Sequence, residues 1–111
     1  MRMWMVDPAT MCDRHLLGEH AEIHMAIGTI AKGRSVAGRV EHGLLEPASF
    51  RTRHDALAAE MVGRGFRHDS PLPDYDLSGL PAEVREHRVD VAAAERELRS
   101  RCRRCGPRAD G

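Results

Sequence analysis

Hydrophobic side chains recur along three stretches of the chain at intervals that suit a helix. Residues 12–32 form the first stretch, in which the apolar positions fall on one side of a helix of 3.6 residues per turn. These positions are Leu16, Leu17, Ile23, Ile27 and Ile30. Asp7 followed by Pro8 is typical of a helix start, and Gly33 is typical of a stop. We therefore predict a helix from about Pro8 to about Ala31.

A second helix is predicted from Pro47 to about Arg64, with Gly65 as its C-terminal stop. Its apolar stripe consists of Phe50, His54, Leu57, Ala58 and Met61. A histidine within such a stripe is more typical of a hydrogen-bonded core residue than of a ligand, and we interpret His54 in that way.

A third helix is predicted from Val91 to about Arg104, because Asp90 is a suitable N-cap. Its inner stripe would consist of Val91, Ala94, Leu98, Cys102 and Cys105. Glycines at 33–43 predict a flexible connection, and prolines at 67–81 predict a loop without regular structure. Neither strand-like alternation nor an internal repeat occurs. We predict an all-α fold, a single compact domain of three packed helices over residues 1–105, with a disordered tail at 106–111.

A polar stripe accompanies the apolar one on the first predicted helix. His15, Glu19 and Glu22 stand at i, i+4 and i+7, which places them along one line of the helix surface. Two carboxylates beside a histidine suit proton handling or cation binding. A solvated polar face would give the same pattern, so the spacing alone leaves both interpretations open.

Composition predicts one globular domain in the cytoplasm. The 111 residues are 41% hydrophobic and 31% charged, which is typical of a globular protein large enough for one core. No apolar run has the length of a membrane span. The first residues lack the pattern of a signal peptide. Three cysteines, an odd number, are expected to be reduced thiols in that compartment.

Charge is balanced overall but uneven along the chain. Seventeen basic residues oppose seventeen acidic ones, so the chain has no uniformly basic surface for nucleic acid. From Arg96 to Arg108, however, six arginines stand against the single acid Glu97. Such a segment can contact phosphates at neutral total charge. A merely solvated arginine-rich tail remains the alternative.

Primary amines are scarce in this sequence. Lys32 is the only lysine, so the terminal amine of Met1 is the other group available for Schiff-base chemistry. An α-amino group has a pKa of about 7.7–8.0, against about 10.4 for lysine, and is therefore far more nucleophilic near neutral pH. We expect Met1 to be retained because Arg2 is large. An ordinary frayed terminus is the alternative.

The run Arg14-His15-Leu16-Leu17-Gly18-Glu19-His20-Ala21-Glu22-Ile23-His24 resembles the first helix of the pyrimidine dimer DNA glycosylase family, whose pattern is H-L-x-x-E-x-x-E. The segment Ala58–Phe66 resembles the family's second helix, which ends in R-G-F, and Asp76–Arg85 is a weaker match. The resemblance implies an N-terminal arm inserted near the first helix. It also implies a DNA glycosylase with AP lyase activity on damaged pyrimidines, with ultraviolet dimers as the expected lesion.

The resemblance also implies roles for individual residues. Met1 would supply the nucleophilic amine, Glu22 the catalytic carboxyl group and Arg2 an adjacent cation. The residues expected to contact DNA or line its site are Arg14, His15, Glu19, Lys32, Arg34 and Arg101. The expected partner is damaged double-stranded DNA, bound by a monomer without a cofactor and without a membrane.

Departures from the family pattern support an alternative function. Ala21 and Met25 stand where basic residues are usual in the family, and no aromatic basic tail follows Cys105. Each missing phosphate contact weakens DNA binding and its salt dependence. The alternative is a non-catalytic DNA- or protein-binding module on the same scaffold.

A small zinc-binding protein is the other alternative. Cys12 and His15 form C-x-x-H, and Cys102 and Cys105 form C-x-x-C, which together are the ligand set of a structural zinc site. Both pairs fall in predicted helices, whereas zinc knuckles usually occupy tight turns, so we predict no metal. The pair His20 and His24 has ligand spacing too, but without the H-E-x-x-H order of a metalloprotease.

Overall fold

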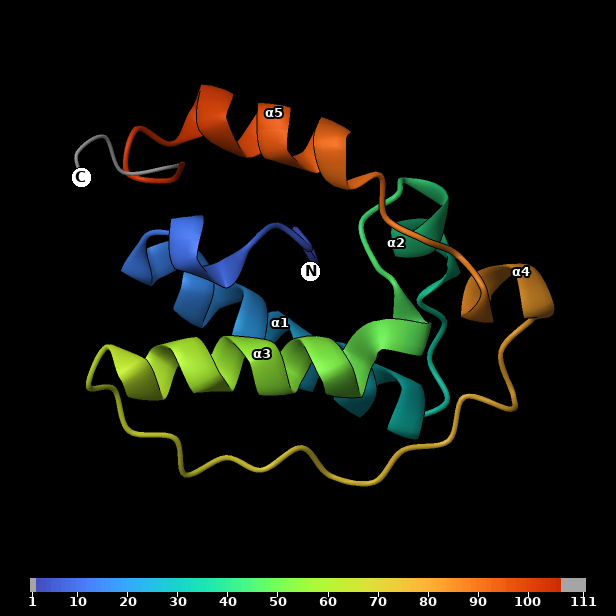
Figure 1. Ribbon diagram of the computed structural model, residues 1–111. Helices are drawn as coiled ribbons and strands as arrows, with labels where there is room; N and C mark the ends of the chain where they lie inside the picture. Colours follow the sequence, from blue (N-terminus) through green and yellow to red (C-terminus); the bar gives the residue numbers. More distant parts are fainter. Residues whose placement is uncertain (1, 107–111) are drawn as a thin grey trace.

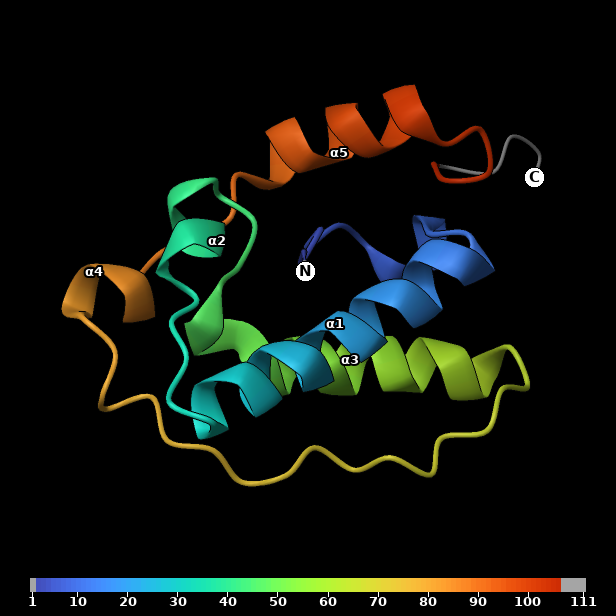
Figure 2. The ribbon, with the colours of Figure 1, turned by 180° about the vertical axis from the view of Figure 1, so that it is seen from behind.

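Two antiparallel helices, α1 (Asp13–Ala31) and α3 (Phe50–Gly63), pack side by side at the centre of the fold (Figures 1 and 2). In this computed structural model residues 2–106 are described. The other helices are α2 (Ala37–Glu41), α4 (Ala82–Arg85) and α5 (Val91–Arg101), with 3-10 turns at Pro8–Thr10 and Pro47–Ser49. The described residues contain no strand, which confirms the all-α prediction. None of these helices is long and apolar enough to cross a membrane.

The first helix begins later than predicted. Asp7 does cap a turn, since its carboxylate accepts a hydrogen bond from the Ala9 amide at 3.0 Å, but that turn is a single 3-10 turn. The backbone then extends through Met11 and Cys12 before α1 starts. The interruption turns both side chains into the protein, where Met11 is 1% and Cys12 8% exposed. Burial of these side chains offsets the lost helical turn.

The second predicted helix is confirmed, with a 3-10 turn as its first three residues. All five residues of its predicted apolar stripe are buried. Gly65 ends it as predicted, with a φ of 90° that a residue with a side chain rarely adopts, while the Phe66 amide donates back to the Met61 carbonyl at 2.9 Å.

The third helix is shorter than predicted. Asp90 caps it as predicted, accepting a hydrogen bond from the Ala93 amide at 3.0 Å. It ends at Arg101, and the prediction that it continues to Arg104 is wrong because Cys102 has the extended backbone angles φ −135° and ψ 116°. Cys102 and Cys105 therefore lie in a turn after α5 and not on its inner stripe.

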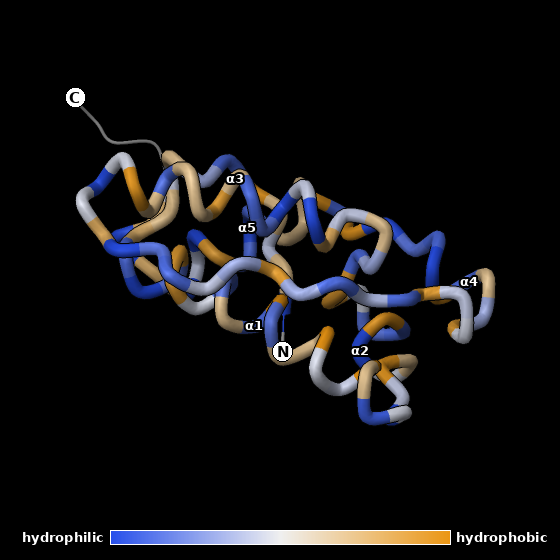
Figure 3. Tube along the Cα trace, turned by 90° about the horizontal axis from the view of Figure 1, so that it is seen from below, coloured by the Kyte–Doolittle hydropathy of each residue, from blue (hydrophilic) through white to orange (hydrophobic). Residues whose placement is uncertain are grey.

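The connections differ in structure. The glycine-rich one, predicted to be flexible, contains α2, which buries Val36 and Val40 against the core. The proline-rich segment 67–81 lacks regular structure apart from a turn near Gly79, in agreement with the prediction. Seen from below, it crosses the α1–α3 layer and is hydrophilic over most of its length (Figure 3). The predicted tail at 106–111 lies outside the described residues apart from Gly106.

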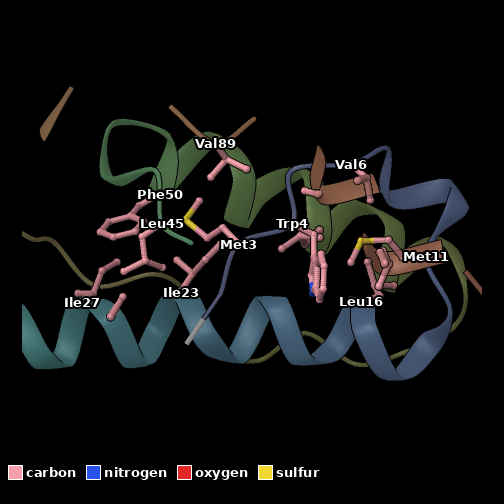
Figure 4. Close-up of a cluster of buried hydrophobic side chains, with 14 of the residues drawn as sticks. Met3, Trp4, Val6, Met11, Leu16, Ile23, Ile27, Leu45, Phe50 and Val89 are labelled. Atoms are coloured by element: carbon pink, nitrogen blue, oxygen red, sulfur yellow. The ribbon is translucent and has the colours of Figure 1, made fainter. Parts of the chain in front are cut away.

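An N-terminal arm (residues 2–7) completes the core. It lies between α1 and α5 in the views of Figures 1 and 2. Met3 and Val6 are 0% and 1% exposed, and Figure 4 shows Met3 packed between Leu45 and Ile23. The amide of Met3 donates to the Leu44 carbonyl at 2.7 Å. The arm is thus fixed by apolar packing and by a backbone hydrogen bond.

A buried ion pair joins α1, α3 and this arm. The Arg53 guanidinium donates two hydrogen bonds to the Glu19 carboxylate, at 2.6 and 2.9 Å, and a third to the Val6 carbonyl at 2.7 Å. Its Nη2 also lies 3.5 Å from the Met11 sulfur. The Glu19 side chain is 0% exposed and that of Arg53 6%. Two charges buried to this degree are tolerated because each satisfies the other.

A cluster of four imidazoles fills the space between α1, α3 and the segment after α3. His20 and His24 come from α1, His54 from α3 and His68 from the following segment. The ring centroids lie 4.6 to 5.2 Å apart in the five pairs other than His24 with His68, and Nε2 of His68 is 3.1 Å from Nε2 of His20. Burial, with neighbouring imidazoles as the second cause, lowers the pKa of His20 to about 4. We call these four residues the histidine cluster.

Replacing Arg53 by methionine is expected to lower the free energy of unfolding by about 3–5 kcal/mol, because it leaves the Glu19 carboxylate buried without a partner. Urea unfolding at pH 7 measures the change. Arg51→Met is the control, since the Arg51–Asp74 pair is 3.9 Å long and exposed, and a change within about 1 kcal/mol is expected there. Equal losses in the two variants would contradict a structural role of the buried pair.

Stability is expected to fall as the pH falls from 7 to 5. His20 has a pKa of 6.5 when unfolded and about 4 when folded, so the unfolded state binds more protons between these values. Its neutral form contributes stability that is complete above pH 6.5, and about 2 kcal/mol of it is lost at pH 5. Urea unfolding at both pH values should show a smaller loss in His20→Gln. An equal loss of stability in His20→Gln and in the wild type would contradict this role. Replacing the exposed His42 by Gln is the control, and it should leave the loss seen in the wild type unchanged.

Candidate active site

The arm brings the start of the chain beside the middle of α1. Met3 packs on Ile23, the residue that directly follows Glu22 (Figure 4). Glu22 itself is half-buried at the border between the buried and the exposed faces of α1. Met1, the predicted nucleophile, lies outside the described residues. From residue 2 onward, the arm packs close to the helical turn of α1 that carries Glu22.

A turn in the arm at Met5 has an unusual backbone conformation. Met5 has a φ of 61°, in the left-handed region that costs a residue with a side chain roughly 1–2 kcal/mol. The turn allows Met3 and Trp4 on one side of it and Val6 on the other to be buried together. Strain of this kind persists only where the surroundings determine the conformation, and it is frequent at functional sites.

Arg2, predicted to be a catalytic cation, is held by two neighbours. Its guanidinium carbon lies 3.8 Å from the centre of the Trp4 ring, and its Nη2 donates to the Glu97 carboxylate at 2.7 Å. Arg101 binds the other oxygen of the same carboxylate at 2.5 Å. The hydrogen bond from Arg2, with the charge of Arg101 as a further contribution, holds the pKa of Glu97 below its ordinary value.

Glu97 therefore connects two predicted site residues, Arg2 and Arg101, and sequence reasoning assigned it no role. The sequence does mark Glu97 as unusual, since it is the single acid among six arginines. Its partner Arg2, however, lies 95 positions away, and no local pattern reveals a contact over that separation.

The polar stripe of α1 divides between surface and interior. Glu19 was predicted to line the DNA site, but its carboxylate is fully covered and paired with Arg53, so it offers no surface to DNA. At 3.6 residues per turn it lies about 60° further toward the core than Glu22. His15 is half-buried and packs edge-on against Trp4, with ring centroids 5.9 Å apart. Burial, together with the charge of Arg14, lowers the pKa of His15.

Arginines surround a groove at the start of α1. The groove has a volume of about 680 Å³ and lies between the first turn of α1 and the turn after α5. Its basic lining residues are Arg14, Arg101, Arg103 and Arg104. The groove thus brings together three residues that were predicted to contact DNA or line its site, Arg14, His15 and Arg101, and it contains two further arginines that the prediction did not name.

The remaining predicted contacts lie at the other end of α1. Lys32 caps that end, and Arg34 lines a second groove beside the turn at Gly79. Arg14 and Lys32 are eighteen residues apart, which is five helical turns, so they share one exposed face about 27 Å apart. Four of the six predicted residues, Arg14, Arg101, Lys32 and Arg34, therefore place positive charge near the two ends of α1, and Glu22 lies between these ends along the helix.

A second group of side chains meets at the first groove. Cys12 and His15 from the start of α1 meet Cys102 and Cys105 from the turn after α5, and we call them the Cys/His cluster. All four ligand atoms lie within 4.8 Å of one another, and all three cysteines are free thiols. Burial raises the pKa of Cys105 to about 12. Burial also opposes ionisation of Cys102, but the amides of Arg104 and Cys105 outweigh it and lower its pKa.

The described residues contain another group that could hold a metal ion. His20, His54 and His68 of the histidine cluster also bring their ring nitrogens within 4.8 Å of one another. Neither group was predicted to bind metal. The sequence shows ligand spacing within each cysteine-containing pair. Whether the two pairs meet in space depends on how the end of α5 packs near the start of α1, which the sequence does not show.

Comparisons with known proteins give one match. The profile of the family described as pyrimidine dimer DNA glycosylase matches residues 1–74. This region contains the arm, α1 and α3, and it ends before α4 and α5. Searches of curated proteins and of solved structures found no match. The match covers two thirds of the 111 residues, and the chain belongs to the pyrimidine dimer DNA glycosylase family.

Proposed function

We propose that the protein is a DNA glycosylase with associated AP lyase activity, acting on ultraviolet-induced pyrimidine dimers through the terminal amine of Met1 and the carboxyl group of Glu22. The observation that carries the proposal is the fixed position of the arm. Met3 is fully buried against Ile23, the residue that follows Glu22, which fixes the arm close to this carboxyl group. Family membership supplies the substrate class.

The proposed reaction proceeds in two stages. The neutral amine attacks C1′ of the deoxyribose, the bond from C1′ to the base breaks, and the displaced base takes up the proton that the amine nitrogen gives up. Glu22 in its acid form protonates O4′ as the sugar ring opens to a protonated imine. As a carboxylate it then removes a proton from C2′, and the electron pair expels the 3′ phosphate oxygen. The damaged nucleotide has to be exposed from the base stack beforehand.

Lys32 is a poor candidate for the same role. It is ten residues beyond Glu22, which is about 15 Å along α1. Its side chain is exposed at the helix end. We therefore assign the nucleophile to the terminal amine of Met1 and not to Lys32.

The exposed face of α1 suits a duplex. Cations stand at both its ends, and their separation of about 27 Å corresponds to roughly eight base pairs. Arg14 and Arg101 would hold phosphates at one end and Lys32 and Arg34 at the other. Arg2 would contribute a positive charge near the reacting amine, which lowers the amine pKa and favours its neutral form.

A non-catalytic DNA-binding module is the second candidate. It is favoured by the pairing of Arg2 and Arg101 with Glu97, because these cations have to exchange a protein carboxylate for a phosphate before they act on DNA. Both candidates would bind DNA through the same surface. Only the enzyme would form a covalent intermediate with the DNA.

Borohydride trapping on duplex DNA with one abasic site distinguishes them. We expect a covalent adduct with the wild type and with Lys32→Arg, and none after acetylation of the terminal amine. Glu22→Gln should lower strand cleavage by about 10²–10⁴-fold. An adduct that survives acetylation but disappears in Lys32→Arg would contradict the proposed nucleophile. Absence of any adduct from folded protein would leave the binding module as the function.

Salt dependence tests the interface separately from the chemistry. Arg14→Ala combined with Arg101→Ala should lower the slope of log K against log salt concentration by about 2, since each phosphate contact contributes about 0.9. Fluorescence anisotropy with a labelled abasic duplex measures it. Arg67→Ala is the matched control, because Arg67 is 89% exposed on the proline-rich segment and should leave the slope unchanged. Equal slopes in the wild type, the double variant and Arg67→Ala would show that the duplex does not contact Arg14 and Arg101.

A further inference from the structure

We propose that the Cys/His cluster binds one structural zinc ion. Its ligands would be Sγ of Cys12, Cys102 and Cys105 and Nδ1 of His15. The inference goes beyond the proposed function, because it holds whether or not the protein is an enzyme. Two of the four ligands lie after residue 74, outside the part of the chain that the family profile matches.

Three of the six distances between ligand atoms lie within about 0.3 Å of those in a tetrahedral site, and the other three are at most 4.8 Å. Zinc binds sulfur at about 2.3 Å and nitrogen at about 2.0–2.1 Å, which places two sulfurs roughly 3.8 Å apart and sulfur and nitrogen roughly 3.5 Å apart. Sγ of Cys12 lies 3.8 Å from Sγ of Cys102 and 3.2 Å from Nδ1 of His15. Sγ of Cys105 lies 3.5 Å from the same nitrogen. The sulfur separation is far above the 2.05 Å of a disulfide.

The backbone suits this role. The prediction of helices at both cysteine pairs argued against zinc, but Cys12 is the N-cap of α1 and the helix α5 ends before Cys102. The C-x-x-C pair therefore occupies a turn, where zinc knuckles are usual. The Cys12 amide donates to Sγ of Cys105 at 3.2 Å, a hydrogen bond of the kind that orients and stabilises a metal-bound thiolate.

The charge of the surroundings is complementary. Three thiolates and a neutral imidazole around Zn²⁺ carry a net charge of −1, because binding releases three thiol protons. The groove beside the cluster is lined by four arginines, Arg14, Arg101, Arg103 and Arg104, and by one acid, Asp13. Arg101 is already paired with Glu97. The remaining excess of positive charge in the lining is of the sign that favours an anionic zinc site.

The position of the cluster explains what an ion would do. It joins the first turn of α1 to the turn after α5, across more than 90 residues of sequence. In Figure 1 α5 lies on the far side of the N-terminal arm from α1 and α3. A cross-link here fixes α5, and with it the arginines of the groove. Four protein ligands leave no open coordination position, which makes the site structural and not catalytic.

The first test is the metal content of the full chain, purified under reducing conditions without added metal. We expect one zinc per chain in the wild type and in His68→Gln, and less than about 0.1 in Cys102→Ser combined with Cys105→Ser. His68→Gln is the matched control because it disrupts the other group of possible ligands. A strong chelator should lower the Tm of the wild type by roughly 10 °C or more. Wild type that holds no zinc and takes up none when it is added would overturn the proposal, as would zinc lost in His68→Gln alone.

Cobalt substitution keeps the test decisive if the double serine variant fails to fold. Wild type loaded with Co²⁺ should show the intense d–d bands of a tetrahedral ion and thiolate-to-metal charge transfer. His15→Cys should keep the tetrahedral bands and gain charge-transfer intensity, because a fourth thiolate replaces the imidazole. A weak octahedral spectrum without charge transfer, or an unchanged spectrum in His15→Cys, would overturn the proposed ligand set.

Discussion

The buried pair of Glu19 and Arg53 is the interaction on which the remaining structure depends. Arg53 uses its guanidinium to hold α1 through the carboxylate and the N-terminal arm through the Val6 carbonyl. The arm is too short to form a core of its own, so its position follows from this contact and from the burial of Met3. The position of Met3 against Ile23, the residue that follows Glu22, depends on the same contacts. A residue outside the proposed catalytic pair thus helps to fix the arm on which the proposal rests.

The sequence predicted the helices well because their signals are local. The apolar stripe of α3 and the cap at Asp90 were confirmed, since both depend on side chains within a few turns of one another. The errors lie where a distant contact overrides the local pattern. The helix predicted from Pro8 is interrupted so that Met11 and Cys12 turn inward, and α5 ends early because Cys102 turns toward Cys12. Both of these errors occur beside the Cys/His cluster.

The candidate site was predicted less completely for the same reason. Helical periodicity placed Glu19 and Glu22 on one stripe, but it does not distinguish a carboxylate at the border of the core from one inside it. Arg53 lies within α3 between Thr52 and His54, and nothing in its neighbourhood of sequence identifies Glu19 as its partner. The predicted roles of Met1 and Glu22 come from family resemblance and remain a proposal. Glu97 was visible as the single acid of its segment, yet its partner Arg2 stands at the other end of the sequence.

The contacts of Arg2 with Glu97 and of Thr10 with Gly106 have a consequence for biosynthesis. The arm finds these partners only after α5 and the turn that follows it have been made. During translation α1 and α3 can associate first, but the arm lacks the carboxylate and the turn that hold it from the other side. The arm is therefore expected to reach its final position late in folding. Any function that depends on the position of the arm would appear only after α5 has joined the fold.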